Sequence, residues 1–125
     1  MNDYYHALYN YNLAFNIDSN NNEAILGILK VNYLKKNYAS NMNFSIHLDL
    51  NFINDPWIFI FLAKSNYESY KNDNNSKENY LEEEKYHKTA AFLNLAYNIS
   101  NEDVFVVKKI VNMLYKIQFY TNVKL

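Results

Sequence analysis

The 125-residue chain contains no cysteine and no arginine, and it has only one glycine and one proline. Without cysteine it can form neither a disulfide nor a thiolate metal site, and it has no thiol nucleophile. Without arginine it lacks the bidentate guanidinium group that recognises phosphate and carboxylate. Sheet-rich domains need turn residues about every 8–12 positions. A chain with one glycine is therefore expected to form long helices that are separated by Asn-, Asp- and Ser-based breaks.

Long apolar runs and strong net charge are also missing. The most apolar run, WIFIFLA at 57–63, is far shorter than the roughly 18–20 residues of a membrane span. The start of the chain lacks the charged and apolar regions of a signal peptide. The net charge of −1 creates no field that would attract nucleic acid. We expect a soluble, intracellular, cytoplasmic protein that binds neither membrane nor nucleic acid and needs no cofactor.

Half of the residues are hydrophobic, and many of these are aromatic. At this chain length, that is enough for one domain with a hydrophobic core. Apolar residues recur at three- and four-residue spacings, which predicts helices. The expected helices cover about 3–17, 22–36, 38–53, 56–70, 78–98 and 102–120. The polar segment near 71–84 is interpreted as a loop insertion.

The breaks between these helices carry capping signals. Asn37 is expected to end the second helix in a left-handed conformation. N-terminal caps are predicted at three places, each from a pair of residues: Asn20 with Glu23, Asp55 with Pro56, and Ser100 with Asp103.

An internal repeat is the strongest signal in the sequence. The motif Lys-x-Asn-Tyr at 30–33 recurs identically at 64–67, an offset of 34. A further offset of 48 carries the apolar pattern of this second copy onto residues 107–115. The alternate helices obey the same two offsets, so that NLAFNI at 12–17 meets NLAYNI at 94–99. The longer offset is accounted for by the polar insertion near 71–84.

A period of 34 with two helices per repeat resembles the tetratricopeptide repeat. Ala7, Tyr11 and Ala14 match the small, aromatic and small positions of that family's second helix. Asn41 stands where the family has a small residue in the next second helix. The resemblance implies one all-α domain over 1–125, built of antiparallel helix pairs stacked as a short right-handed solenoid. In this frame the chain begins with a second-type helix and ends with a first-type helix. We therefore expect open terminal faces, covered by another subunit, a partner or a longer parent chain.

Candidate catalytic and metal-binding residues are sparse. Glu84-x-x-His87 has the spacing of a di-iron ligand pair, but no second pair is present. The run Glu82–Glu84 could supply acid–base chemistry, although acidic residues also decorate helix N-termini. The other histidines, His6 and His47, lie far away in the sequence. There is no Gly-rich phosphate loop or nucleophile elbow. We predict no catalytic residue, no metal site and no enzyme activity.

The resemblance also implies a binding face. In tetratricopeptide arrays the first helix of each pair lines a concave groove that can hold a peptide. The residues of the repeated motif would lie there: Lys30, Asn32, Tyr33, Lys64, Asn66 and Tyr67. The tyrosines can equally be interpreted as packing between helices. A local basic face near the C-terminus could meet an acidic peptide, and its residues are Lys108, Lys109, Lys116 and Lys124.

The expected function is a non-catalytic scaffold or adaptor that binds a peptide segment of a protein partner. The alternative is a structural subunit that stacks through its terminal helices in a larger or self-assembled complex. A helical-repeat RNA binder would need a basic groove, which the near-neutral composition does not favour. A small bundle enzyme would need an assembled site, and none is visible in the sequence.

Overall fold

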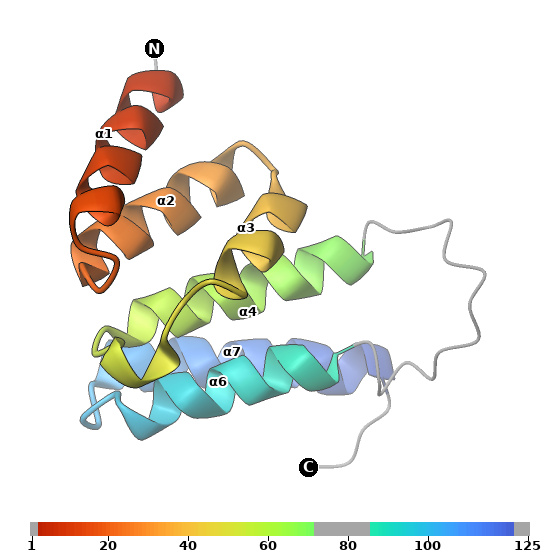
Figure 1. Ribbon diagram of the computed structural model, residues 1–125. Helices are drawn as coiled ribbons and strands as arrows, with labels where there is room; N and C mark the ends of the chain where they lie inside the picture. The colour runs from red at the N-terminus through yellow and green to blue at the C-terminus, as the bar shows by residue number, and fades with distance from the viewer. Residues whose placement is uncertain (1–2, 72–85, 122–125) are drawn as a thin grey trace.

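The computed structural model describes residues 3–71 and 86–121, and this part of the chain is all helical, without strands (Figure 1). Its α-helices are α1 (Tyr4–Ile17), α2 (Asn22–Leu34), α3 (Tyr38–Ser45), α4 (Pro56–Lys71), α6 (His87–Asn98) and α7 (Val104–Thr121), with a 3-10 turn at Leu50–Phe52. The prediction of an all-α protein with about six helices is confirmed for the described residues. Lys71, the first residue of the predicted insertion, instead ends α4, and the rest of the insertion lies outside the described residues. The start of the predicted helix 78–98, Glu82, Glu84 and Lys124 also lie outside them.

The third helix is shorter than the sequence pattern predicts. The helix expected over 38–53 ends at Ser45, whose hydroxyl donates a hydrogen bond to the Met42 carbonyl at 2.6 Å. Further along, the Asp49 side chain accepts from the Asn51 N–H at 3.1 Å and starts the 3-10 turn. Short polar side chains thus offer the backbone alternatives to the helical ladder. Apolar periodicity cannot reveal this competition.

One of the three predicted caps is correct as stated. The Trp57 N–H donates to the Asp55 carboxylate at 2.9 Å, and Pro56 is the first residue of α4. The cap of α2 is Asn21, which accepts from the Ala24 N–H at 3.1 Å, and the prediction of Asn20 was wrong. The two asparagines are chemically identical. Asn20 instead lies in the turn that follows α1, where its backbone N–H donates to the Asp18 carboxylate at 3.0 Å.

Two further end assignments are corrected. The Asp103 carboxylate caps α7 by accepting from the Phe105 N–H at 2.9 Å, whereas the Ser100 hydroxyl donates back to the Tyr97 carbonyl at 2.8 Å. The left-handed residue after α2 is Lys36, with φ of 62°, and Asn37 instead precedes α3. Each error is a shift of one to three residues among neighbouring polar residues.

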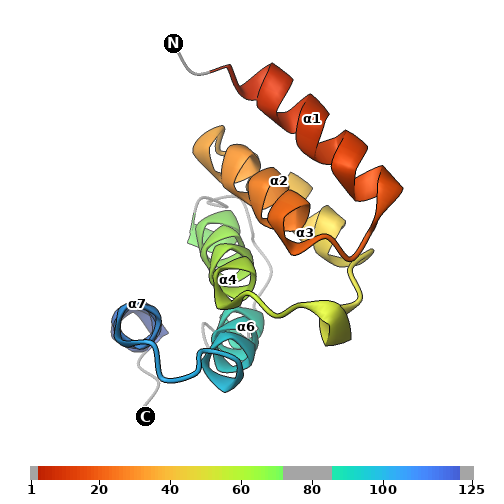
Figure 2. The ribbon, with the colours of Figure 1, turned by 90° about the vertical axis from the view of Figure 1, so that its left-hand side faces the viewer.

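The helices pack in a layered order around α4 (Figure 2). Helix α2 packs on α1, α3 and α4, and α4 packs on α3, α6 and α7. Seen along the helices, α2, α4 and α7 follow one another on one side, and α1, α3 and α6 lie on the other. The apolar run at 57–63 forms much of α4, and its Ile58, Ile60 and Leu62 are fully buried. This apolar helix is therefore the centre of the hydrophobic core.

A buried polar junction joins three of these helices. Asn41 of α3 is fully buried, and its amide donates to the Leu29 carbonyl and to the Ser65 hydroxyl, both at 2.9 Å. It also accepts from the Asn32 amide at 3.1 Å. These bonds satisfy a polar side chain at the position where the tetratricopeptide resemblance predicts a small residue. The junction ties α3 to α2 on one side and to α4 on the other.

The same kind of junction recurs at the repeat offsets. Asn66 lies 34 residues after Asn32, and Thr89 lies 48 residues after Asn41. In the structure the Thr89 hydroxyl donates to the Asn66 side-chain oxygen, and both residues are buried. In both copies, an asparagine on one helix is bonded to a polar residue on the next helix. The internal repeat thus extends from the sequence to a hydrogen bond between packed helices.

Candidate functional site

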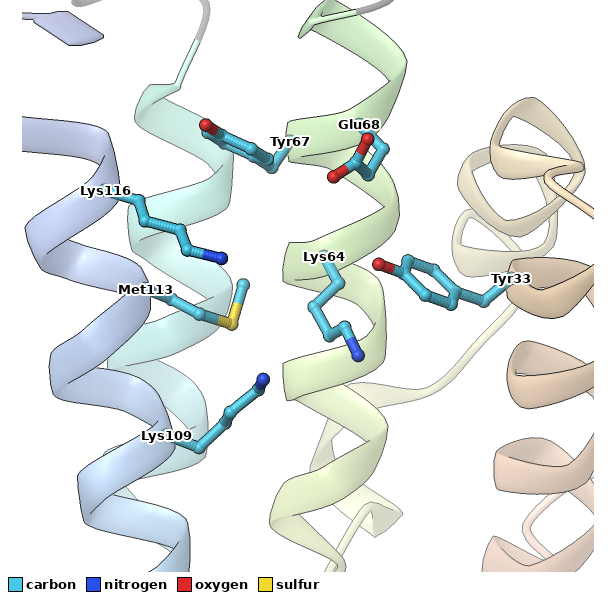
Figure 3. A pocket seen from close by; sticks show the side chains of 7 residues that line it. All are labelled: Tyr33, Lys64, Tyr67, Glu68, Lys109, Met113 and Lys116. Carbon is cyan, nitrogen blue, oxygen red and sulfur yellow. The ribbon is translucent and has the colours of Figure 1, made fainter. Parts of the chain in front are cut away.

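A small hollow between α2, α4 and α7 is lined by three lysines and one glutamate (Figure 3). Its volume is about 40 Å³. We call it the lysine pocket. The residues that line it are Tyr33, Lys64, Tyr67, Glu68, Lys109, Met113 and Lys116.

Helical spacing brings these side chains to one place. Lys64, Tyr67 and Glu68 are three and four residues apart, so they share a face of α4. Lys109, Met113 and Lys116 share a face of α7 for the same reason. Figure 3 shows Lys109 and Lys116 extending from α7 toward the space beside α4, while Tyr33 reaches in from α2. Three helices that are well separated in the sequence therefore build one pocket.

Aromatic rings position Lys64. Its ammonium nitrogen lies 4.4 Å from the ring centroid of Tyr33 and 4.7 Å from that of Phe61. Tyr33 and Phe61 contact each other edge to face, with centroids 5.7 Å apart. Contacts of a cation with ring faces are worth about 0.5–2 kcal/mol, more where water is excluded. They hold the half-buried Lys64 in place without neutralising its charge.

The electrostatics of the pocket are dominated by positive charge. Burial lowers the pKa of Lys64, and the nearby charges of Lys109 and Lys116 lower it further, while Glu68 acts in the opposite direction. Burial also raises the pKa of Tyr33, helped by Glu68 and Tyr38. A tyrosine hydroxyl is protonated at neutral pH even without this shift, so Tyr33 can donate a hydrogen bond there. Among the described residues that line the pocket, three cations face a single carboxylate.

The repeated motif is divided between the pocket and the core. Tyr33, Lys64 and Tyr67 line the pocket, and Lys30 lies exposed beside it, 6.0 Å from the Phe61 ring centroid. Tyr67 is also buried, only 7% exposed, and its ring packs at a tilt of 34° on that of Tyr86, with centroids 5.2 Å apart, as the packing interpretation of the tyrosines expects.

The two asparagines of the motif point the other way. Asn32 and Asn66 are only 7% and 4% exposed, and their amides are used within the core. Asn32 donates to Asn41 at 3.1 Å, and Asn66 donates to the Met42 sulfur at 3.4 Å. Neighbouring residues on a helix lie about 100° apart around its axis. A motif of four consecutive residues therefore cannot lie entirely in one groove.

The α7 contribution to the pocket was only partly visible in the sequence. The C-terminal lysines were recognised as a basic face, but nothing in the sequence showed which of them approach Lys64. Lys109 and Lys116 do so, and Lys108 instead borders a different hollow with Tyr97 and Val104. The seven-residue spacing of Lys109 and Lys116 was the available signal, because it places both side chains on the same face of a helix.

Other candidate sites are dispersed. His6 bonds to Asp3 at the start of α1, while His47 and His87 are exposed on separate helices or turns. Within residues 3–71 and 86–121, no three His, Asp or Glu side chains gather as a metal site. None of the helices described there combines the length and apolarity that crossing a membrane requires.

Comparison of the chain with protein-family models, with curated proteins and with solved structures gave no match. In the part of the chain that the structure describes, the lysine pocket gathers three lysines around one glutamate.

Proposed function

We propose that the chain is a non-catalytic, cytoplasmic interaction domain that holds an acidic peptide segment of a protein partner in the lysine pocket. We further propose that its helices form a tetratricopeptide-like, right-handed solenoid of antiparallel pairs. The offsets of 34 and 48, the shared side of α2, α4 and α7, and the recurring Asn junctions support this arrangement. The pocket would then lie on the concave side, formed by the first helix of each pair.

The observation that carries the proposal is the excess of cations in the pocket. The positive charges of Lys109 and Lys116 repel that of Lys64, and this repulsion adds to burial, the larger cause, in lowering the pKa of Lys64. A carboxylate placed among them would relieve this repulsion and could accept hydrogen bonds from the ammonium groups and from Tyr33. Ammonium groups act as point charges and do not need the two-pronged geometry of arginine.

The size and walls of the pocket define the ligand further. A hollow of about 40 Å³ admits a group such as one carboxylate. It is much smaller than the roughly 300–1,000 Å³ of pockets that bury a drug-sized molecule. Met113 and the rings of Tyr33 and Tyr67 offer apolar surface beside the charges. The proposed ligand is therefore an Asp, Glu or C-terminal carboxylate flanked by apolar side chains.

Selection from a displayed library of random peptides tests the proposal without requiring that the partner be identified first. We expect the protein to enrich sequences that combine Asp or Glu with apolar residues. The triple variant Lys64→Gln, Lys109→Gln, Lys116→Gln should lose this enrichment because the cations that attract the carboxylate are gone. An identical set of peptides from the triple variant, or no enrichment by the wild type, would refute the proposal.

Single variants then measure each contact. Removing one charge-assisted hydrogen bond costs about 1–2 kcal/mol, or about 5–30-fold in Kd. We expect Lys109→Gln and Lys116→Gln to weaken binding of an enriched peptide by this factor in fluorescence anisotropy. Lys108→Gln is the matched control, because it removes the same charge from the adjacent position outside the pocket.

A further inference from the structure

Helix α1 carries an exposed apolar stripe. Its members are four residues apart and so follow one face of the helix. Their exposed fractions are 76% for Tyr5, 55% for Tyr9, 45% for Leu13 and 87% for Ile17. We call these four residues the α1 stripe. The opposite face of α1 packs on α2, so the stripe points away from the molecule's own core.

Helix α7 carries a second apolar stripe, formed by Val104, Val107, Val111 and Tyr115. Their spacings of three, four and four residues place them on one face. Val104 is 72% exposed, Val111 is 50% and Tyr115 is 71%. With Tyr97 of α6, the start of this α7 stripe borders an open hollow of about 430 Å³. The lysine pocket uses a different face of α7, because Lys109 and Lys116 lie more than a quarter turn away from the stripe.

The two stripes cannot meet within one molecule. Both ribbon views place α1 at one end of the helix stack and α7 at the other, with α2 and α4 between them (Figures 1 and 2). Contiguous apolar surface on a helix face is a frequent mark of protein–protein contact. A contact between these two stripes therefore requires two copies of the chain.

Charge distinguishes the possible pairings. Residues 3–29 contain the carboxylates of Asp3, Asp18 and Glu23 and no lysine or arginine. Residues 102–121, which include the turn and cap before α7, contain three lysines and the carboxylates of Glu102 and Asp103, a net charge of +1. Two α7 helices in contact would bring lysines together, and two α1 helices would bring carboxylates together. Only α1 against α7 joins surfaces whose net charges have opposite signs, and such complementarity favours this pairing.

We propose that copies of the chain associate head to tail, with the α1 stripe of one copy packed on the α7 stripe of the next. The order of helices agrees with this contact. In the described part of the chain α2 is covered by α3 and α4 by α6, and the α1 of a second copy would cover α7 in the same way. Because the contact joins two different surfaces, each added copy leaves one stripe of each kind free. Association of this type continues into open chains unless the rotation closes a ring.

Light scattering coupled to size exclusion is the first test. We expect the weight-average mass to rise with concentration from 14.9 kDa to values above that of a dimer. Added salt should reduce the rise, since part of the attraction is between charges on the surface. A mass that stays at 14.9 kDa over the whole accessible concentration range would overturn the proposal.

Complementation between two blocked variants tests the head-to-tail geometry itself. Tyr9→Lys places a cation in the α1 stripe, where it would approach α7 and its net positive charge. Val111→Glu places a carboxylate in the α7 stripe, where it would face the acidic α1 end. We expect each variant alone to be monomeric and an equimolar mixture to form a 1:1 dimer that grows no further. The dimer uses the intact α7 of the first variant and the intact α1 of the second.

Other outcomes exclude the proposal in distinct ways. If Tyr9→Lys still self-associates, α7 pairs with α7, and if Val111→Glu does so, α1 pairs with α1. A mixture that remains monomeric shows that the stripes do not meet. Asn43→Lys, an exposed change on α3, is the control that should assemble like the wild type. Circular dichroism verifies that each variant is folded, and Val104→Glu at a 72% exposed position replaces Val111→Glu if that variant is not.

Discussion

At the scale of single residues, the only glycine of the chain sets the distance between two helices. Gly27 lies inside α2 and is buried, although glycine costs a helix interior about 1 kcal/mol relative to alanine. A Cβ atom at this position would come within 2.5 Å of three ring atoms of Tyr11 on α1. The missing side chain therefore makes room for the Tyr11 ring and lets α1 approach α2.

The effect of Gly27→Ala should consequently change sign with the residue at position 11. In the wild type we expect a net loss of about 1–2 kcal/mol, because overpacking against Tyr11 outweighs the better helix propensity. In a Tyr11→Ala background the same change should stabilise by about 0.5–1 kcal/mol, since only propensity remains. Urea denaturation of the four proteins measures both values. The same sign in both backgrounds would contradict the close contact between Gly27 and the ring.

A second residue-scale prediction concerns the buried junction at Asn41. Asn41→Ala leaves the Asn32 amide and the Ser65 hydroxyl without their buried partner, and we expect it to cost about 2–4 kcal/mol. Asn41→Thr should cost less, because Thr89 makes the equivalent contact to Asn66 in the other copy. Asn43→Ala, an exposed change on the same helix, is expected to stay within about 0.5 kcal/mol. Equal losses for Asn41→Ala and Asn43→Ala would argue against the junction.

At the scale of helices, the sequence predicted an element best where only one residue could serve as its cap. The apolar run at 57–63, preceded by Asp55-Pro56, predicted α4 and its first residue correctly. The Asn-rich breaks were harder, since adjacent asparagines cap equally well and only tertiary contacts select one. For the site, the repeat identified Lys64 and Tyr33 but could not tell that Asn32 turns into the core. Lys109 and Lys116 could be assigned to the pocket only from the three-dimensional packing of α7 against α4.

The charged environment between α4 and α7 predicts a pH dependence. Because the pKa of Lys64 is lowered in the folded protein from its ordinary value of 10.5, the folded state holds its proton less tightly than the unfolded chain. Stability contributed by this group therefore increases as the pH rises through the interval between the lowered pKa and 10.5. The raised pKa values of Tyr33 and Tyr38 act in the opposite direction, and their contribution is lost above about pH 10.

Lys64→Met isolates the lysine contribution from that of the tyrosines. It keeps the apolar stem but has no charge to repel Lys109 and Lys116. We expect the stability of the wild type relative to Lys64→Met to improve as the pH is raised from 7 toward 10.5, measured by chemical denaturation at fixed ionic strength. A difference that is constant with pH, or that moves against the wild type, would show that the three lysines do not interact as described.

At the scale of the whole molecule, α7 presents two different surfaces. One face supplies Lys109, Met113 and Lys116 to the lysine pocket, and another carries the exposed α7 stripe. Head-to-tail association through the stripe would leave the pocket accessible and would align one pocket per copy along the assembly. Tyr9→Lys and Val111→Glu should therefore abolish assembly while each keeps the affinity for a single acidic peptide within about twofold, a difference of about 0.4 kcal/mol.

An assembled row of pockets would also show avidity. A peptide carrying two acidic segments joined by a flexible linker should bind the assembled wild type more tightly than it binds the blocked monomers. The single-segment peptide should not distinguish them. Surface-immobilised peptide and biolayer interferometry measure both. Equal affinity of wild type and monomeric variants for the two-segment peptide would show that neighbouring pockets are not presented together.

The central claim is that the lysine pocket binds a carboxylate, and Lys108 and Lys109 test it most directly. These adjacent residues of α7 carry the same charge, but only Lys109 lines the pocket. The measurement is an anisotropy titration of one library-selected acidic peptide against the wild type, Lys108→Gln and Lys109→Gln. The account predicts about 5–30-fold weaker binding for Lys109→Gln and little change for Lys108→Gln. Equal affinities of the two variants would contradict it.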